Sequence, residues 1–126
     1  MLTTQISSAS AQNETPTAPA VQELAPKAAQ QTFETMMGAL EDNNRLAFVA
    51  LADADFKAAL TPPVFKSVVD QIAFRLQAGH KTTYFGETKK KGFAVYLWRV
   101  RFDDDGDDAL VEMSIKDEKV GGFFLR

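Results

Sequence analysis

The sequence predicts one α+β domain in which helices come first and a four-stranded antiparallel meander follows. Up to Leu76 the apolar residues recur three or four positions apart, which is helical spacing, and from His80 onward they alternate, which is the spacing of a half-buried strand. The length of 126 residues, with 45% hydrophobic and 25% charged residues, suits a single globular domain.

Residues 1–27 differ in composition from the rest of the chain. They are rich in Ala, Thr, Ser, Gln and Pro and hold no aromatic residue, which predicts a disordered tail before a domain at residues 28–126. Ala9-Ser10-Ala11 resembles the small-residue end of a secretory signal, but the charged and hydrophobic parts that should precede it are missing. An exported protein (periplasmic or secreted) with a trimmed signal and a cytoplasmic protein with a plain tail both remain open.

Three helices are expected. The first begins near Pro26, because proline suits a first helical turn, and stops before Asn43-Asn44. Its apolar stripe consists of Ala29, Phe33, Met36, Met37 and Leu40.

A second, shorter helix is expected to carry Leu46 to Leu51 and to end around Asp53. The third should begin with Thr61 as N-cap and Pro62 in the first turn, and should end at Gly79 as a C′ residue. Its core positions are Val64, Phe65, Val68, Val69, Ile72 and Leu76.

Four strands are expected near residues 80–87, 93–103, 108–116 and 119–126. Asp105-Gly106 is a two-residue hairpin signal, since glycine tolerates the positive φ of a type I′ turn. A turn there brings Arg99 opposite Glu112 on the outer face. The inner face then carries the pairs Phe102–Ala109, Val100–Val111, Trp98–Met113 and Tyr96–Ile115.

The first and last strands are less constrained. With Asp117-Glu118 as a turn, Val120, Gly122 and Phe124 point inward and Phe123 and Leu125 point outward. A bulge at the neighbouring glycines would reverse that assignment, and this alternative remains open. In the first strand the expected inward residues are His80, Thr82 and Tyr84, and Phe85 is expected to point outward.

Three segments carry a resemblance to a known superfamily: Ala59-Leu60-Thr61-Pro62, Leu76-Gln77-Ala78-Gly79 and Val120-Gly121-Gly122-Phe123-Phe124. Together with the order of elements, they resemble the nuclear-transport-factor-2-like, or cystatin-like, superfamily, and most of all an uncharacterised bacterial branch of it. The resemblance implies a curved sheet around the helices, a pocket at the open end and frequent dimerisation. Enzymes of the superfamily carry Asp, His or Tyr in that pocket, but none of their catalytic motifs matches here residue by residue.

A pocket is expected on the inner face, where a largely apolar surface includes a few side chains that end in polar atoms. The candidate ligand-binding residues are His80, Tyr84, Tyr96, Trp98 and Met113. The alternative is that these side chains only fill the core. General acid–base catalysis would need a titratable side chain with a suitable pKa, such as His80, Asp53 or Asp55, and a second group that orients it. The sequence shows no such pair, so no catalytic residue is predicted.

Metal and nucleic-acid sites are not expected. The chain has no cysteine, which excludes disulfides and cysteine-ligated metals. The aspartates around Gly106 fail the EF-hand pattern because the twelfth position from Asp103 is Ser114, so a solvated turn is expected and no cofactor is predicted. A net charge of −3 and a short basic turn at Lys89-Lys90-Lys91 do not favour nucleic acid, and no apolar run is long enough to span a membrane.

The outer sheet face is expected to carry an apolar stripe, and a stripe of that size favours a homodimer through this face. The bulge described above is the competing interpretation, because it would turn two of the residues inward. A non-enzymatic binding or interaction domain, with room for a small apolar or aromatic ligand, is therefore the expected function, and a pocket enzyme of isomerase, cyclase or dehydratase type is the alternative. The interface candidates are Phe85, Val95, Leu97, Arg99, Leu110, Phe123 and Leu125.

Overall fold

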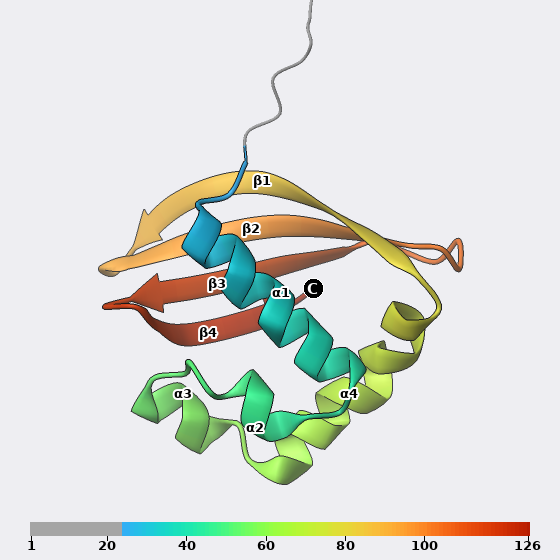
Figure 1. Cartoon of the computed structure of the whole chain (residues 1–126), viewed down its shortest axis with the longest axis horizontal. Coiled ribbons are helices and arrows are strands. Elements are labelled where there is room, and N and C mark those ends of the chain that lie inside the picture. The colour runs from blue at the N-terminus through green and yellow to red at the C-terminus, as the bar shows by residue number, and fades with distance from the viewer. Residues whose placement is uncertain (1–23) are drawn as a thin grey trace, which may run out of the picture.

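The computed structural model describes residues 24–126 as helices followed by an antiparallel sheet (Figure 1), which confirms the predicted α+β class. No helix in these residues is long and apolar enough to cross a membrane. The elements are α1 (Lys27–Glu41), α2 (Arg45–Phe48), α3 (Ala54–Ala59), α4 (Pro62–Gln77), β1 (His80–Lys90), β2 (Phe93–Phe102), β3 (Ala109–Lys116) and β4 (Lys119–Leu125).

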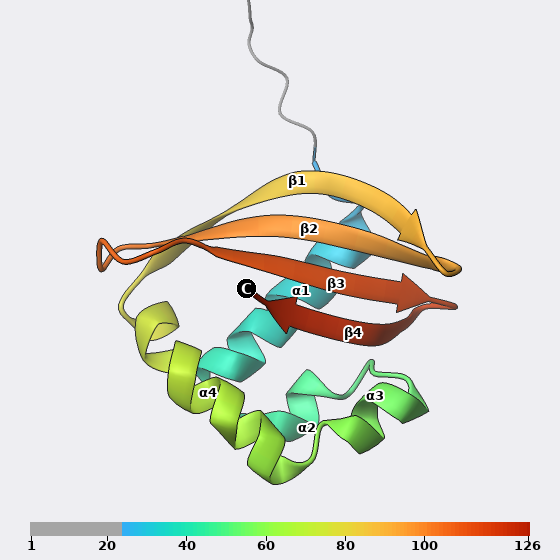
Figure 2. The same ribbon diagram turned by 180° about the vertical axis from the view of Figure 1, so that it is seen from behind.

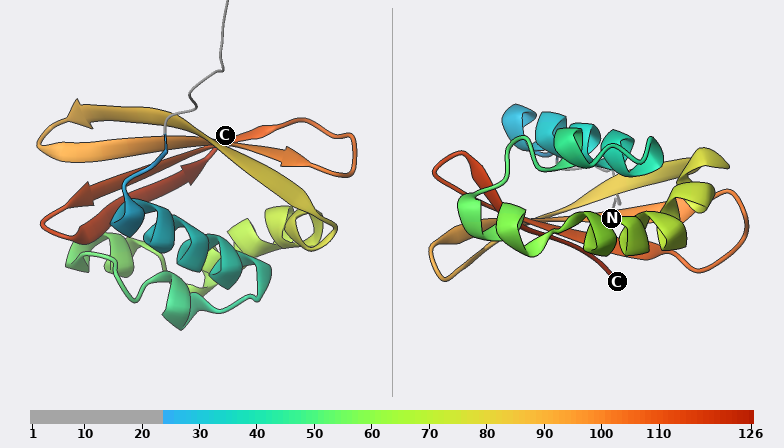
Figure 3. Two further views of the ribbon diagram at one scale, coloured as in Figure 1. Left: turned by 45° about the horizontal axis from the view of Figure 1, so that its top comes forward. Right: turned by 90° about the horizontal axis from the view of Figure 1, so that it is seen from below.

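The strands form one meander in the order β1-β2-β3-β4. Helix α1 crosses the inner face of this sheet, and the view from behind shows the opposite, outer face without a covering helix (Figure 2). The sheet is strongly twisted, and all four helices lie together on one side of it (Figure 3). The structure therefore has two layers, with its core between α1 and the inner face.

The first and last helices match their expected ends. Helix α1 starts directly after Pro26 and stops before Asn43, whose φ of 55° is left-handed. At the start of α4 the Thr61 hydroxyl accepts a hydrogen bond from the Val64 N–H at 3.4 Å, and Pro62 occupies the first turn. Gly79 follows α4 with φ of 115°, a conformation that side chains with a Cβ rarely adopt.

The segment between them holds one helix more than expected. Helix α2 ends at Phe48, and Asp53 caps a separate helix, α3, because its Oδ1 accepts a hydrogen bond from the Phe56 N–H at 2.8 Å. The prediction that the second helix continues to about Asp53 is therefore wrong. A carboxylate that can satisfy free N–H groups favours the start of a helix over its end.

The β2–β3 hairpin has a longer loop than the sequence predicted. Strand β2 ends at Phe102 and β3 begins at Ala109, so the two-residue turn at Asp105-Gly106 is wrong. Observed partners are Val100–Ala109, Trp98–Val111 and Tyr96–Met113, a shift of two residues from the expected register. An even shift keeps every side chain on its face, and the predicted inner face survives.

The predicted pair of Arg99 and Glu112 does not survive this shift. Arg99 lies opposite Leu110, and Glu112 lies opposite Leu97. Glu112 instead forms an ion pair with Arg126, with 3.2 Å between Oε1 and Nη2.

Strand β4 contains the bulge that the sequence left open. Ser114 pairs with Gly122 and Ile115 with Val120, so Gly121 is the additional residue. Consequently Phe123 points into the core with 8% of its surface exposed, and Leu125 packs against the core. The predicted outward positions of Phe123 and Leu125 are therefore wrong, as is the predicted inward position of Phe124, which is 52% exposed.

Strand β1 also has an irregularity, between Tyr84 and Gly86. Tyr84 lies opposite Trp98 and packs against the core, whereas Phe85 points outward and is 54% exposed, as expected. The strand is longer than predicted because its turn comes only at Lys91 and Gly92, with φ of 55° and 84°.

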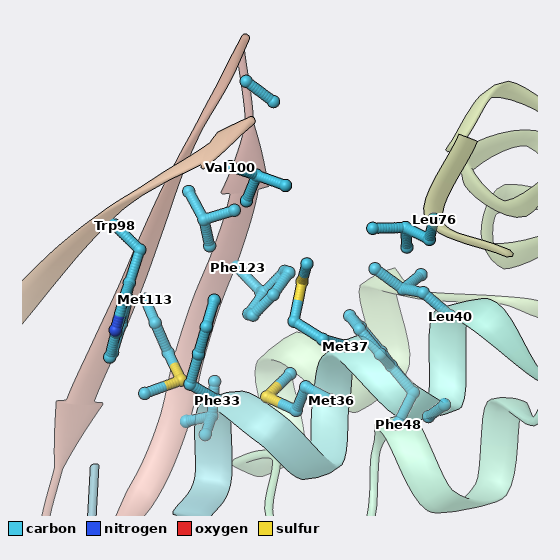
Figure 4. Packing of buried hydrophobic residues seen from close by; sticks show 14 of the residues in the cluster. Phe33, Met36, Met37, Leu40, Phe48, Leu76, Trp98, Val100, Met113 and Phe123 are labelled. Carbon is cyan, nitrogen blue, oxygen red and sulfur yellow. The ribbon is translucent and has the colours of Figure 1, made fainter. Parts of the chain in front are cut away.

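The core joins α1, α2 and α4 to the inner sheet face (Figure 4). Phe33 stacks on Trp98 with ring centroids 4.0 Å apart, and Phe48 meets Phe123 edge-on at 5.3 Å. Every residue predicted for the apolar stripe of α1 is buried: Ala29, Phe33, Met36, Met37 and Leu40.

Candidate functional site

Two of the five predicted pocket residues belong to the core. Trp98 is 1% exposed and Met113 is fully buried. The indole Nε1 of Trp98 donates a hydrogen bond to Oε1 of Gln30 at 3.1 Å, and its ring face is occupied by Phe33. The polar tip of the tryptophan therefore has a protein partner on α1, as expected for a packed aromatic side chain.

The other three surround this core without closing a common site. Tyr84 and Tyr96 are partly buried, and their rings lie 5.5 Å and 6.3 Å from that of Trp98. Burial, with a contribution from the charge of Glu87 opposite, raises the pKa of the Tyr96 hydroxyl. The Nδ1 of His80 lies 3.0 Å from the backbone carbonyl oxygen of Leu76, at the end of α4.

A groove of about 540 Å³ lies elsewhere, between α4 and the end of β4. Figure 2 shows these two elements near the C-terminal end of the strand. Val68 and Ile72 form the helix wall, and Phe123 and Leu125 contribute the opposite wall. The remaining lining residues are Gln71, Arg75, Asp107, Asp108, Ala109, Phe124 and Arg126.

Arg75 fixes the mouth of this groove. Its guanidinium lies 3.8 Å from the centroid of the Phe102 ring, its Nε donates to Oδ2 of Asp104 at 2.7 Å, and its Nη2 donates to the Asp107 carbonyl at 2.8 Å. The hydrogen bonds from Arg75 and from the Gly106 N–H lower the pKa of Asp104 to about 2. The same bond to Asp104 raises the pKa of Arg75. The aspartate-rich loop is thus tied to α4.

The free edge of β4 runs along the groove. At its start, the Val120 N–H donates to the Leu51 carbonyl at 2.8 Å, and the Asp53 N–H donates to the Val120 carbonyl at 2.8 Å. Residues 51–53 therefore extend the sheet by a short parallel bridge. Farther along, the edge faces the groove.

The outer sheet face has a different character. Phe85 and Phe124 are exposed and Leu97 and Leu110 are half-buried, and together these four define the outer patch. Val95 lies on the same face but is already buried by its neighbours. The predicted interface stripe therefore keeps three of its six apolar members and gains Phe124, which the sequence had assigned to the inner face.

A second hollow of about 500 Å³ lies at the opposite end of the sheet, at the two hairpin tips. Its lining includes four lysines and one aspartate, Lys89, Lys90, Lys91, Lys116 and Asp117. These side chains come from the two turns and the strand ends beside them, and the four lysines make this end of the sheet positively charged.

No family model matches this chain, and no curated protein matches it. Among solved structures it is similar to the crystal structure of an uncharacterized cystatin fold protein from Novosphingobium aromaticivorans, with a TM-score of 0.43 and 11% sequence identity. The match covers 76% of this chain and 95% of that protein. Helices followed by an antiparallel four-stranded sheet are the arrangement that the resemblance to the cystatin-like superfamily implies.

Proposed function

We propose that this domain is a non-enzymatic interaction module that pairs with a second copy of itself through the outer face of its sheet. The observation that carries the proposal is the outer patch, which lies on a face that no helix of residues 24–126 covers (Figure 2). Exposed apolar side chains that gather on one face of a sheet are typical of a protein contact surface.

The polar residues around the patch support a self-complementary contact. Arg99, Glu112 and Arg126 place charges of both signs between and beside the patch residues, because Glu112 pairs with both Leu97 and Phe124, and Arg99 pairs with Leu110. In a two-fold dimer each residue can meet a different residue of the partner, so the cation of one protomer can face the anion of the other. Among the described residues, the Nε of Arg99 is the buried side-chain nitrogen without a hydrogen-bond partner.

A binding role is preferred to catalysis because of the surroundings of His80. A general acid–base residue needs an orienting group such as a carboxylate. The hydrogen bond of the His80 ring goes to the backbone of Leu76. The isomerase, cyclase or dehydratase alternative has no comparable observation in its favour.

Sedimentation velocity of the full chain tests the proposal. The wild type should sediment as a dimer at micromolar concentration, and Leu97→Glu and Phe85→Glu should both sediment as monomers, because the interface would bury an unpaired charge. Val64→Glu is the matched control, since Val64 is exposed on α4, away from the patch, and this variant should remain dimeric. A monomeric wild type at every accessible concentration would overturn the proposal, as would equal dissociation by Val64→Glu.

A further inference from the structure

The edge of β4 changes at its bulge from paired to unpaired. Before the bulge, Val120 uses both its N–H and its carbonyl to bind residues 51–53. Beyond the bulge, no segment of residues 24–126 pairs with the outer edge of the strand. The sheet therefore already accepts an added strand at this edge, but the addition stops after Asp53, where α3 begins.

The hydrogen-bond ladder identifies the free groups. Arg126 and Leu110 exchange two backbone hydrogen bonds, of 2.9 Å and 3.1 Å. Bonded pairs alternate with unbonded ones in an antiparallel ladder, so Phe124 also bonds toward β3, whereas Phe123 and Leu125 direct their N–H and C=O groups away from it. Within the described part of the chain, these outward groups have no backbone partner. Such a row is a template for another strand.

The groove lies beside the unpaired edge of β4 and has an apolar wall. Its volume of about 540 Å³ lies in the range of ligand-binding clefts. Val68 and Ile72 of α4 face the strand across it. Its charged lining residues are two cations and two anions, and three of the four already have partners: Arg75 is bound to Asp104, Arg126 to Glu112 and Asp108 to Arg101. The lining therefore favours an uncharged occupant.

We propose that this groove binds an extended, uncharged peptide that adds to the edge of β4 as a further strand. The peptide backbone bonds to the N–H and C=O groups of Phe123 and Leu125, and every second side chain, small and apolar, packs against Val68 and Ile72. Main-chain bonds supply affinity in this mode of recognition, and the alternating side chains supply selectivity. The site adjoins the proposed contact between protomers, because Phe124 and Arg126 line the groove and also belong to the outer face, whereas Val68 and Ile72 lie on α4.

A pair of peptide probes tests the backbone bonds. The parent is an acetylated and amidated pentapeptide of alternating valine and threonine, and the two test peptides carry N-methyl groups on its valines or on its threonines. In a strand, alternate N–H groups point to opposite edges. One methylated peptide should therefore bind as well as the parent and the other at least tenfold more weakly. Equal binding by both would show apolar contact alone and overturn the proposal, as would no binding at millimolar concentration.

Amide hydrogen exchange locates the added strand. Peptide binding should slow exchange at Phe123 and Leu125 at least tenfold, and should leave Phe124 and Arg126 unchanged because they already bond to β3. Val68→Arg should abolish the effect, and Val64→Arg, one turn earlier on α4 and outside the groove, should retain it. The Leu97→Glu variant, which should be monomeric, should still bind the peptide. Failure of the peptide proposal can therefore be distinguished from failure of the dimer proposal.

Amide exchange in the protein without peptide is the last test. Slow exchange at Phe123 and Leu125 before any peptide is added would mean that the edge is already covered, and this would overturn the proposal. Protection that grows with protein concentration would then identify a second copy as the occupant. Protection independent of concentration would identify another part of the same chain.

Discussion

The rings of Phe33 and Trp98 lie face to face, with centroids 4.0 Å apart and planes inclined by 2°. One ring belongs to α1 and the other to β2, so this contact fixes the helix on the inner face of the sheet. The contact also accounts for the burial of Trp98, because the ring of Phe33 covers one face of its indole.

Replacing Phe33 by alanine should therefore destabilise the fold strongly. The loss of a large buried ring and the cavity that it leaves cost about 3–5 kcal/mol of unfolding free energy. Urea denaturation followed by tryptophan fluorescence measures this, since the chain has one Trp. Phe74→Ala removes an 80%-exposed ring from α4 and should change stability by less than about 0.5 kcal/mol. Similar losses in the two variants would contradict the packing described.

The ion pair of Arg75 and Asp104 should make stability depend on acid pH. The pKa of Asp104 falls to about 2 in the folded protein, below its ordinary value of 3.8, so folding favours the ionised carboxylate. The resulting stabilisation is present above pH 3.8 and is lost as the pH falls through about 2. Asp104→Asn should be less stable than the wild type near neutrality and equal to it below pH 2.

Urea midpoints measured across that pH range provide the check. Asp105→Asn is the control, because it removes a charge from the same loop without removing the partner of Arg75. A difference between wild type and Asp104→Asn that persists unchanged at the lowest pH would count against the ion pair as its source.

The glycine at the β4 bulge should resist substitution. A Cβ at Gly121 would overlap the ring of Phe93 and would lie 3.1 Å from Oδ2 of Asp53. Gly121→Ala should therefore cost about 1–3 kcal/mol, the usual penalty of overpacking. Gly38 offers a matched control within α1, where a Cβ would meet no atom within 4 Å and Gly38→Ala should stabilise by about 1 kcal/mol.

Thermal denaturation of both variants and of the double variant Gly121→Ala/Phe93→Ala measures these effects. The double variant should be less destabilised than the sum of its single changes, because removing the ring makes room for the added methyl group. Strict additivity would show that the ring does not restrict this position.

The raised pKa of Tyr96 should appear in alkaline titration. Burial disfavours the tyrosinate, and the negative charge of Glu87 adds to the effect. In the Tyr84→Phe background Tyr96 is the remaining tyrosine, and its absorbance change should occur above the ordinary pKa of 10. Stability is full below pH 10 and declines as the pH rises through the raised value. Glu87→Gln should move the transition partway back, and no movement would exclude the carboxylate as a contributor.

Features with local causes could be predicted from the sequence. Thr61 caps α4 and Gly79 ends it because the interactions involved span only a few residues. The two-residue turn at Asp117 and Glu118 was also found, with φ of 52° and 65°. Alternation identified the inner face correctly, so Trp98 and Met113 lie on the same side despite the wrong register.

Features with distant causes could not be predicted. The loop after β2 is held by Arg75, which lies 29 residues before its partner Asp104, and no local pattern reports this bond. The two glycines in β4 signalled a bulge but did not decide it, and the ring of Phe93, which lies against Gly121, is 28 residues away in the sequence. The groove was missed for the same reason, because Phe123 and Leu125 had been placed on the wrong face.

The additional residue in β4 has a consequence for how this chain can vary. Deleting one of the two glycines would remove the bulge and leave Phe123 opposite Met113 and Phe124 opposite Glu112, because strict alternation from Val120 would then give the same faces. A strand of the present length that paired without the bulge would instead turn Phe124 inward and Phe123 outward. In this protein one surplus residue in the final strand therefore decides which phenyl group the surface presents.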